Sequence, residues 1–332
     1  MRKTLVVTVA LAALALAACG SSTKATPSVT SAAGTIGSTT ATTTAGGKAV
    51  TSNASLPAVT GAFGAKPAIA KATGTPPKEL QVRALSAGDG PAVATGDTVF
   101  VNYLGQLWEG KEFDNSFDRG SAFNFSVGKG GVIQGWDEGV VGQKVGSRLE
   151  LVIPPDKGYG AKGSGATIPA NATLVFVVDV LGAFNGTSSA SGAAVAQDDP
   201  ALPKVTAEPG KKPTITIPSG GAAPTELVVK TLIDGTGPAV AKGKTLVAQY
   251  VGEVWASGKE FDASWDRAAA AFPIGVGKVI PGWDEALVGK KVGSRVLLSI
   301  PPAKGYGAAG NTRAGISGTD TLVFVVDLLG AY

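Results

Sequence analysis

The sequence predicts two α+β domains, each an antiparallel sheet packed against one short helix. The first reason is an internal repeat, in which Tyr103, Trp136 and Tyr159 recur as Tyr250, Trp283 and Tyr306, each pair 147 residues apart. A period this long indicates two whole domains rather than a solenoid of short repeats. The second reason is that both copies show the two-residue alternation of strands and only one short stretch suited to a helix.

Five separated motifs carry the repeat. They are Asn102–Gly105 with Gln249–Gly252, Gly110–Asp114 with Gly258–Asp262, Gly135–Glu138 with Gly282–Glu285, Lys157–Gly160 with Lys304–Gly307, and Thr173–Asp179 with Thr321–Asp327. A further match pairs Leu56–Thr60 with Leu202–Thr206, so the repeat extends upstream of the strand-rich region.

Alternation within each copy predicts the strands. Leu80–Ala84 and Arg148–Leu151 alternate in this way, which is the period of a sheet with one buried face and one wet face. The helices are expected to begin at Trp136 and Trp283, because the two acidic residues that follow each Trp complement the helix dipole in a first turn.

The N-terminus has the pattern of an export signal. Arg2 and Lys3 precede an almost entirely apolar run over 5–18, and its 14 residues suit a signal peptide but fall short of the about 20 that span a bilayer. The run ends at Cys19 after two Ala residues, which resembles the bacterial lipoprotein box, and in that family the Cys is acylated. The alternative is an ordinary cleaved signal with an incidental Cys19. We expect a chain anchored by lipid to the extracytoplasmic face of the cell membrane.

Five segments are therefore expected along the chain. They are a lipoprotein signal peptide over 1–18, a tether over 19–55, a first domain over 56–184 with its core at 78–184, a linker over 185–200, and a second domain over 201–332 with its core at 225–332. The tether and the linker are rich in small and polar residues, so they cannot bury enough apolar area to offset their ordering entropy and are expected to be flexible.

Composition excludes several kinds of chemistry. The chain has no His and one Cys, which excludes His-based catalysis, an intrachain disulfide and a cysteine cluster for zinc. The net charge is +4, but the scattered Lys and Arg form no basic stripe, so no nucleic-acid partner is expected. Gly158–Gly163 matches a dinucleotide fingerprint, yet Gly and Pro break the stretch where that fingerprint requires a helix. No cofactor and no metal are expected.

Two groups of charged residues could suggest catalysis. Asp137 and Glu138 are adjacent and point apart on a helix, which favours structural capping over a pair of catalytic carboxylates. Asp114, Asp118 and Arg119 are echoed in the second copy and form either a buried charge cluster or a surface ion network. Spacing alone does not decide between these two interpretations.

The order of the aromatic and glycine motifs is informative. In the first copy it runs Tyr103, Phe113–Asp114, Arg119, Phe123, Val132–Ile133, Gly135–Trp136, Tyr159–Gly160, Ile168–Pro169 and Thr173–Phe176. This order and spacing resemble the FKBP family, the macrolide-binding immunophilins with prolyl isomerase activity, over residues 78–183 and 225–331. The resemblance implies a twisted antiparallel sheet curled around a short helix, with a proline pocket between them.

The resemblance also implies a role for each matching position. Trp136 would form the pocket floor, and the apolar walls would be Tyr103, Phe113, Phe123, Val132, Ile133 and Phe176. The Ile133 backbone N–H would bind the substrate carbonyl, while Tyr159 would give a hydroxyl donor, Asp114 a polar contact and Ile168 the flap. The matching positions of the second copy are Tyr250, Phe261, Asp262, Phe272, Val279, Ile280, Trp283, Tyr306, Ile316 and Phe324. The alternative for the aromatic set is ordinary core, although the retained Tyr306–Gly307 loop is poor core material.

The second copy departs from the pattern at four places. It has one extra residue between Arg267 and Phe272, Ile274 in place of Phe125, Lys278–Val279 without the Gly130–Gly131 spacer, and Ser317 in place of Pro169. We expect these differences to alter its peptide preference more than its activity.

The resemblance implies a peptidyl-prolyl cis–trans isomerase for exported or cell-envelope proteins. Its expected partners are proline-containing unfolded or partly folded chains, macrolide inhibitors, and the membrane through the N-terminal lipid, and the protein is expected to be a monomer. The alternative is a non-catalytic chaperone or scaffold that holds proline-containing segments through the same pockets, since two tethered sites favour avidity. A purely structural lipoprotein is a third, less favoured interpretation.

Overall fold

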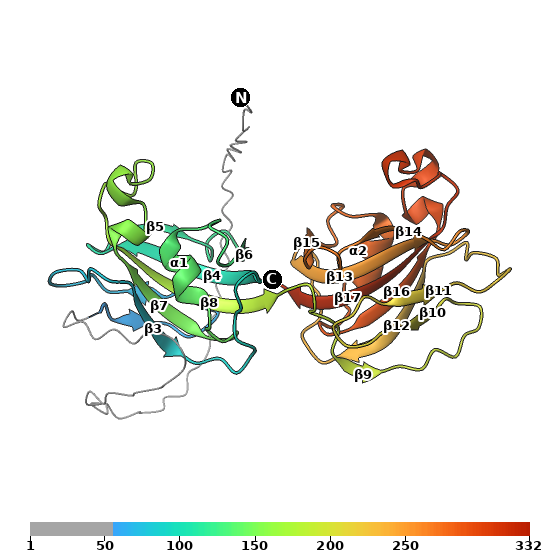
Figure 1. Ribbon diagram of the computed structural model, residues 1–332, viewed down its shortest axis with the longest axis horizontal. Coiled ribbons are helices and arrows are strands. Elements are labelled where there is room, and N and C mark those ends of the chain that lie inside the picture. Colours follow the sequence, from blue (N-terminus) through green and yellow to red (C-terminus); the bar gives the residue numbers. More distant parts are fainter. Residues whose placement is uncertain (1–55) are drawn as a thin grey trace, which may run out of the picture. The chain divides into compact units, whose positions relative to one another are not determined.

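The computed structural model describes residues 56–332, so the predictions for the signal peptide, Cys19 and the tether lie outside the described residues. In the described part, each copy of the repeat forms an antiparallel sheet that carries one short helix (Figure 1). No helix of residues 56–332 is both long enough and apolar enough to span a membrane.

The first domain contains a sheet, one helix and a separate small hairpin. Its elements are β1 (Val59–Thr60), β2 (Ala68–Ile69), β3 (Gln81–Ser86), β4 (Thr98–Leu107), β5 (Glu112–Asn115), β6 (Phe123–Ser126), α1 (Gln134–Val140), β7 (Arg148–Ile153) and β8 (Leu174–Phe184). The sheet order is β3-β7-β8-β4-β5, with β6 also paired to β4, and β1 pairs only with β2. Every one of these pairings is antiparallel.

The second domain repeats this arrangement with one added strand. Its elements are β9 (Gly192–Ala194), β10 (Lys204–Thr206), β11 (Thr214–Thr216), β12 (Val228–Gly235), β13 (Thr245–Val254), β14 (Lys259–Ala263), β15 (Ala270–Pro273), α2 (Pro281–Leu287), β16 (Arg295–Ile300) and β17 (Leu322–Ala331). The sheet order is β14-β13-β17-β16-β12-β9, with β15 also paired to β13, and β10 and β11 form the second hairpin. The α+β prediction is confirmed in both copies.

The inner face of each sheet packs against its helix. In the first domain, Trp136 and Val140 of α1 share one buried core with the inward side chains of β7. The helix approaches the sheet closely at Gly135, where an added Cβ would lie 2.5 Å from Ile153. The second domain has the same close approach between Gly282 and Ile300, at 2.7 Å. Glycine is therefore needed at the point where helix and sheet meet.

The outer face of each sheet differs from the prediction of a wet face. All six residues of β7 and all six of β16 are buried. The segment that contains β1 and β2 covers the first sheet, where Val152 and Val175 pack with Ala72. In the second domain, Val205 and Ile215 of the β10–β11 hairpin cover the matching strands. The expectation of one wet face was wrong because a second apolar layer, supplied by each hairpin, lies on it.

Each helix begins two residues earlier than the Trp at which its start was expected. The acidic residue after the Trp bonds mainly to the preceding loop. Asp137 accepts hydrogen bonds from the backbone N–H groups of Gly128 and Gly130, both at 2.8 Å, and Asp284 repeats this with Gly275 and Gly277. These carboxylates thus fix the loop that leads into the helix, in addition to lying in its first turn.

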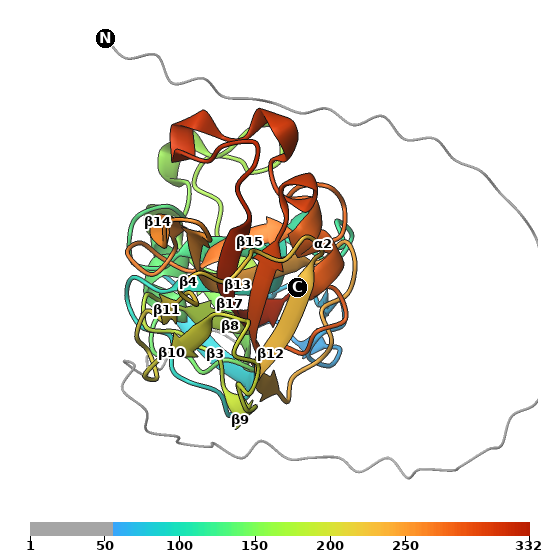
Figure 2. The same cartoon turned by 90° about the vertical axis from the view of Figure 1, so that its right-hand side faces the viewer.

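The segment between the domains also differs from the flexible linker expected over 185–200. Residues 192–194 form β9, which extends the second sheet beyond β12, as Figure 2 shows at the edge of that domain. The side chain of Gln197 then bonds to both the backbone N–H and the backbone C=O of Val205. A short apolar stretch gains order here because an open sheet edge offers it backbone partners.

Candidate active site

An aromatic cluster lies against α1 in the first domain. The ring of Trp136, which is 4% exposed, lies 5.2 Å from that of Tyr103 and 5.2 Å from that of Phe176, both edge to face. Phe123 adds a third contact to the Trp136 ring at 6.0 Å, and Phe113 packs edge-on against Phe176 at 5.5 Å. Edge-to-face packing at these separations is the favoured geometry for aromatic pairs, so the five rings form one rigid apolar surface.

The other predicted site residues of the first domain border this cluster. Val132 and Ile133 are half-buried against the core around Trp136, and Ile168 is buried within it. Tyr159, 40% exposed, is close enough to Asp114 for the carboxylate to help raise the pKa of its hydroxyl, although burial is the larger cause. The structure therefore brings all ten predicted positions of this copy together, and the roles assigned to them stay predictions.

A polar network lies beside the rings. The Tyr103 hydroxyl donates to Asp114, Arg119 pairs with the same carboxylate, and Arg119 also donates to the Tyr103 oxygen at 2.8 Å. The Arg119 guanidinium lies 5.4 Å from the centre of the Tyr103 ring, within range of a cation–π interaction. Burial raises the pKa of Tyr103 to about 12, with the bond to Asp114 adding to the shift and Arg119 opposing it. The hydroxyl is therefore protonated at neutral pH and acts as a donor.

One backbone donor beside the cluster is free. The carbonyl of Ile133 accepts from Trp136 and Asp137 at the start of α1, whereas none of the hydrogen bonds among residues 56–332 uses the Ile133 N–H. Ile280 of the second domain has the same arrangement. The indole N–H groups of Trp136 and Trp283 are buried and also lack a partner within the described residues. Because the indole N–H groups are enclosed by the core, the Ile N–H is the donor that each site can offer to a ligand carbonyl next to an apolar surface.

The second domain also has a cluster of five rings. Tyr250, Phe272 and Phe324 surround Trp283 at 5.3 to 5.4 Å, and Phe261 packs on Phe324. Val279, Ile280 and Ile316 border this core as in the first copy, whereas Tyr306, the remaining predicted position, is 37% exposed. The flap is one residue longer and contains a turn of 3₁₀ helix over Thr312–Ala314. The Tyr250 hydroxyl donates to Asp262, and burial raises the pKa of Tyr250 well above its ordinary range.

Phe125 and Arg119 were not included among the predicted site residues. Phe125 stacks on Phe123 and lies 5.4 Å from Trp136. The predicted match of Phe272 with Phe123 and of Ile274 with Phe125 was wrong, because the strand pairing places Phe272 at the position of Phe125 and Ala270 at that of Phe123. The alternation of Phe123 and Phe125 along one strand was the signal that could have found the extra ring. Arg119 could not be assigned from spacing, because its contact with Tyr103 depends on how the loop after β5 folds.

The charged group that spacing left open divides between the two faces of the sheet. Asp114 and Arg119 join Tyr103 beside the aromatic cluster. Asp118 points the other way and bonds to Lys66 of the hairpin segment at 2.8 Å. The three residues are thus neither one buried cluster nor one surface network.

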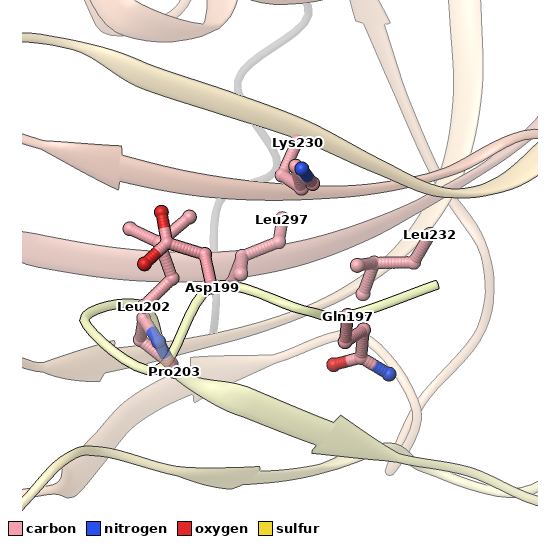
Figure 3. A pocket seen from close by; sticks show the side chains of 7 residues that line it. All are labelled: Gln197, Asp199, Leu202, Pro203, Lys230, Leu232 and Leu297. Carbon is pink, nitrogen blue, oxygen red and sulfur yellow. The ribbon is translucent and has the colours of Figure 1, made fainter. Parts of the chain in front are cut away.

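A small cavity in the second domain does not form a competing active site. A cavity of about 10 Å³ lies on the outer face of the second sheet, between Lys230 and Leu297 on one side and Asp199 and Leu202 on the other (Figure 3). This volume admits about one water molecule, so the cavity cannot hold a substrate. No group of three or more potential acidic or Cys metal ligands gathers anywhere in residues 56–332.

Comparison with known proteins identifies the same two regions. The family described as FKBP-type peptidyl-prolyl cis–trans isomerase matches residues 90–181 and 237–329. FK506-binding protein 1A of Neurospora crassa is 46% identical over 104 residues, which cover 31% of this chain and 87% of that protein. An FK506-binding protein of Streptomyces anulatus is 44% identical over 118 residues, covering 35% of this chain and 95% of its own. Mouse peptidyl-prolyl cis-trans isomerase FKBP9 is 30% identical over 238 residues, which span 71% of this chain and 35% of the mouse protein.

Proposed function

The chain belongs to the FKBP-type peptidyl-prolyl cis–trans isomerase family and is a folding catalyst of that class, and from this premise we propose that both of its sites turn over X–Pro bonds of exported proteins. The observation that carries the proposal is the duplicated set of aromatic cluster, Tyr–Asp–Arg network and free Ile backbone N–H. Proline-containing unfolded chains are the proposed substrates.

Catalysis of this reaction requires only a lower rotational barrier. Resonance in the amide gives a barrier of about 18–20 kcal/mol, whereas the two X–Pro isomers differ by only about 0.5–1 kcal/mol. In the twisted transition state the nitrogen no longer donates into the carbonyl, so the carbonyl carries less charge than in the planar amide. Water stabilises the planar form, and an apolar surface that removes this water favours the twisted form. A thousandfold acceleration needs about 4 kcal/mol.

The residues of the first site suit this mechanism. The ring of Trp136 would lie under the proline, and the free Ile133 N–H would bind the carbonyl of the substrate. The Tyr103 hydroxyl is committed to Asp114, so it would serve to hold the wall of the site and not to transfer protons. The reaction makes and breaks no covalent bond, which agrees with a site that contains no His.

Binding of FK506, the ligand in the names of the relatives, tests whether the aromatic clusters are the binding sites. In the full chain, Trp136→Ala combined with Trp283→Ala is expected to lower FK506 affinity at both sites by at least tenfold in a titration. Because both Trp side chains are buried, Phe113→Ala with Phe261→Ala provides a second pair at half-buried positions. Unchanged FK506 affinity in either folded double variant, judged by circular dichroism, would refute the site assignment.

A non-catalytic chaperone or scaffold is the second candidate. Two sites on one chain favour it, because linked sites bind a chain with several prolines more tightly than either site alone. Turnover distinguishes the candidates, since a scaffold binds FK506 and proline peptides without accelerating isomerisation.

We further propose that Cys19 is acylated and anchors the protein as a monomer on the extracytoplasmic face of the cell membrane. The apolar run over 5–18 and the small residues before the single Cys support this proposal. Labelled fatty acid is expected to appear in the wild-type chain and not in Cys19→Ala. Label retained in Cys19→Ala would contradict the anchor, and light scattering of the detergent-free Cys19→Ala chain tests the monomer.

A further inference from the structure

The two hairpins lie outside the regions that match the family, yet side-chain hydrogen bonds or ion pairs join each hairpin segment to its own sheet. In the first domain, Arg148 donates to the carbonyls of Gly61 at 2.6 Å and Ala65 at 2.7 Å, and the indole N–H of Trp108 donates to Gly74. In the second domain, Trp255 donates to Gly221 in the same way. The hairpin is therefore a regular part of each duplicated unit.

One lysine from each hairpin segment reaches the strand that carries the site residues. Lys66 lies 2.8 Å from Asp118 and 3.2 Å from Glu112, at either end of β5 and its following turn. Lys212 makes the same two contacts with Asp266 and Glu260, both at 3.2 Å. We call each of these three-residue groups a brace. The brace is present in both copies, although the hairpins around it differ in sequence.

A β-bulge places the brace directly behind the site. The pairing of β4 with β5 skips Phe113, since Gly105 is opposite Asp114 and Gln106 is opposite Glu112. Phe113 and Asp114 therefore both face the aromatic cluster, while Glu112 and the residue after Asp114 face the hairpin. The matching bulge in the second domain lies at Phe261. A contact made by Glu112 on the outer face thus acts on the backbone next to Asp114 on the inner face.

The two copies differ in one residue beside the brace and also in the geometry of the site. In the first copy the amide of Asn115 donates to Glu112 at 2.6 Å and to Asp118 at 2.9 Å, which ties the two carboxylates together. The second copy has Ala263 at this position, which cannot make these bonds. The copy that contains Asn115 also holds its Arg closer to the Tyr. Arg119 is 46% exposed and lies 2.8 Å from the Tyr103 oxygen, whereas Arg267 is 62% exposed and lies 3.3 Å from the Tyr250 oxygen.

We propose that Lys66 and Lys212 are positioning residues that hold the Asp–Arg pair of each site from the outer face of the sheet, and that Asn115 makes the first brace the tighter one. The proposal deepens the proposed function and rests on it for its consequence. The tighter brace gives the first site a more closely held Arg119 beside Tyr103, so the two sites are expected to bind the same ligand unequally.

The direct test observes the tyrosine oxygen and needs no turnover. The chain has five Tyr, so ¹³C-labelled tyrosine gives five Cζ resonances, which single Tyr→Phe changes assign, and the Cζ shift responds to hydrogen bonds on the hydroxyl. In the full chain at pH 7, Lys66→Met and Asn115→Ala are expected to move the Tyr103 resonance toward the position of Tyr250, and Lys66→Arg to restore it. Ala263→Asn is expected to move the Tyr250 resonance the opposite way.

The controls separate positioning from a general loss of stability. Lys291→Met removes another exposed ion pair, with Asp234, and is expected to leave both tyrosines unchanged. An unchanged Tyr103 resonance in a folded Lys66→Met chain would overturn the proposal, as would equal shifts of Tyr103 and Tyr250.

The binding consequence is measured by titration with FK506. Exposed ion pairs contribute little, so Lys66→Met is expected to weaken the first site about two- to fivefold and to leave the second site unchanged. If FK506 binds neither site in the wild-type chain, the proposed function fails, whereas the brace is still judged by the Tyr103 resonance. Equal weakening of both sites would overturn the positioning role.

Discussion

Replacing Arg148 tests whether the hairpin layer is an integral part of the first domain. Arg148 forms two bonds with Asp179, at 2.6 and 2.7 Å, and the side chains are 2% and 0% exposed. Arg148→Met leaves the Asp179 carboxylate buried without its partner and removes the donors to Gly61 and Ala65. Breaking a buried pair from one side costs about 3–5 kcal/mol. Because one kcal/mol shifts the Tm of a domain of this size by at least about 2–4 °C, we expect the first domain to unfold about 10 °C lower.

The assay is scanning calorimetry of the full chain, in which Arg295→Met identifies the transition of the second domain. Arg295 forms the matching pair with Asp327, also buried. Asp179→Leu added to Arg148→Met is expected to recover part of the loss, since two apolar groups leave no unpaired charge. A decrease in Tm below about 2 °C in Arg148→Met would refute the reasoning, and so would a double variant less stable than the single one.

Three further predictions concern the first domain. Gly105→Ala would place a Cβ 2.6 Å from Phe176, so FK506 affinity at the first site should fall at least tenfold in a titration while Gly252 keeps the second site intact. Burial raises the pKa of Glu150. Below its ordinary pKa of 4.5 the carboxyl is protonated and does not reduce the stability of the domain, whereas its ionisation reduces that stability as the pH rises through the raised pKa. Glu150→Leu, the residue found at Leu297, should therefore stabilise the first domain by about 1 kcal/mol at pH 7 and by less at pH 4, measured by calorimetry. Burial raises the pKa of Tyr103 to about 12, so its bond to Asp114 is lost only as the pH rises through about 12, and turnover should be flat from pH 6 to 9. A bell-shaped profile in that range would contradict this role for Tyr103.

The repeat and the aromatic motifs made the fold and most of the site predictable. Strand alternation in Leu80–Ala84 and the single helical stretch at Trp136 are local patterns, and both correspond to observed elements. The aromatic positions of the cluster were identified because they recur in order in two copies, which chance does not produce.

The hairpin layers were not predictable from periodicity. Strands β1 and β2 have two residues each, too short for an alternation to be recognised. Without knowledge of that cover, the outward residues of β7 were expected to be wet, although Glu150 and Arg148 are buried. The strand β9 was missed for the same reason, because three small residues gain order only from the sheet edge beside them.

The polar part of the site depended on one local irregularity. The bulge at Phe113 turns Asp114 toward Tyr103 and leaves Asp118 for Lys66, and no spacing rule separates these two acids. Bulges are set by pairing with a neighbouring strand, so the sequence of β5 alone does not reveal them.

The central claim, that both sites are catalytic, is tested most directly by a proline-limited refolding assay with the full chain. We expect acceleration that FK506 suppresses, a partial loss in Trp136→Ala and in Trp283→Ala, and a complete loss when the two changes are combined. A chain that binds FK506 at both sites but leaves the refolding rate unchanged would contradict the claim and favour the scaffold.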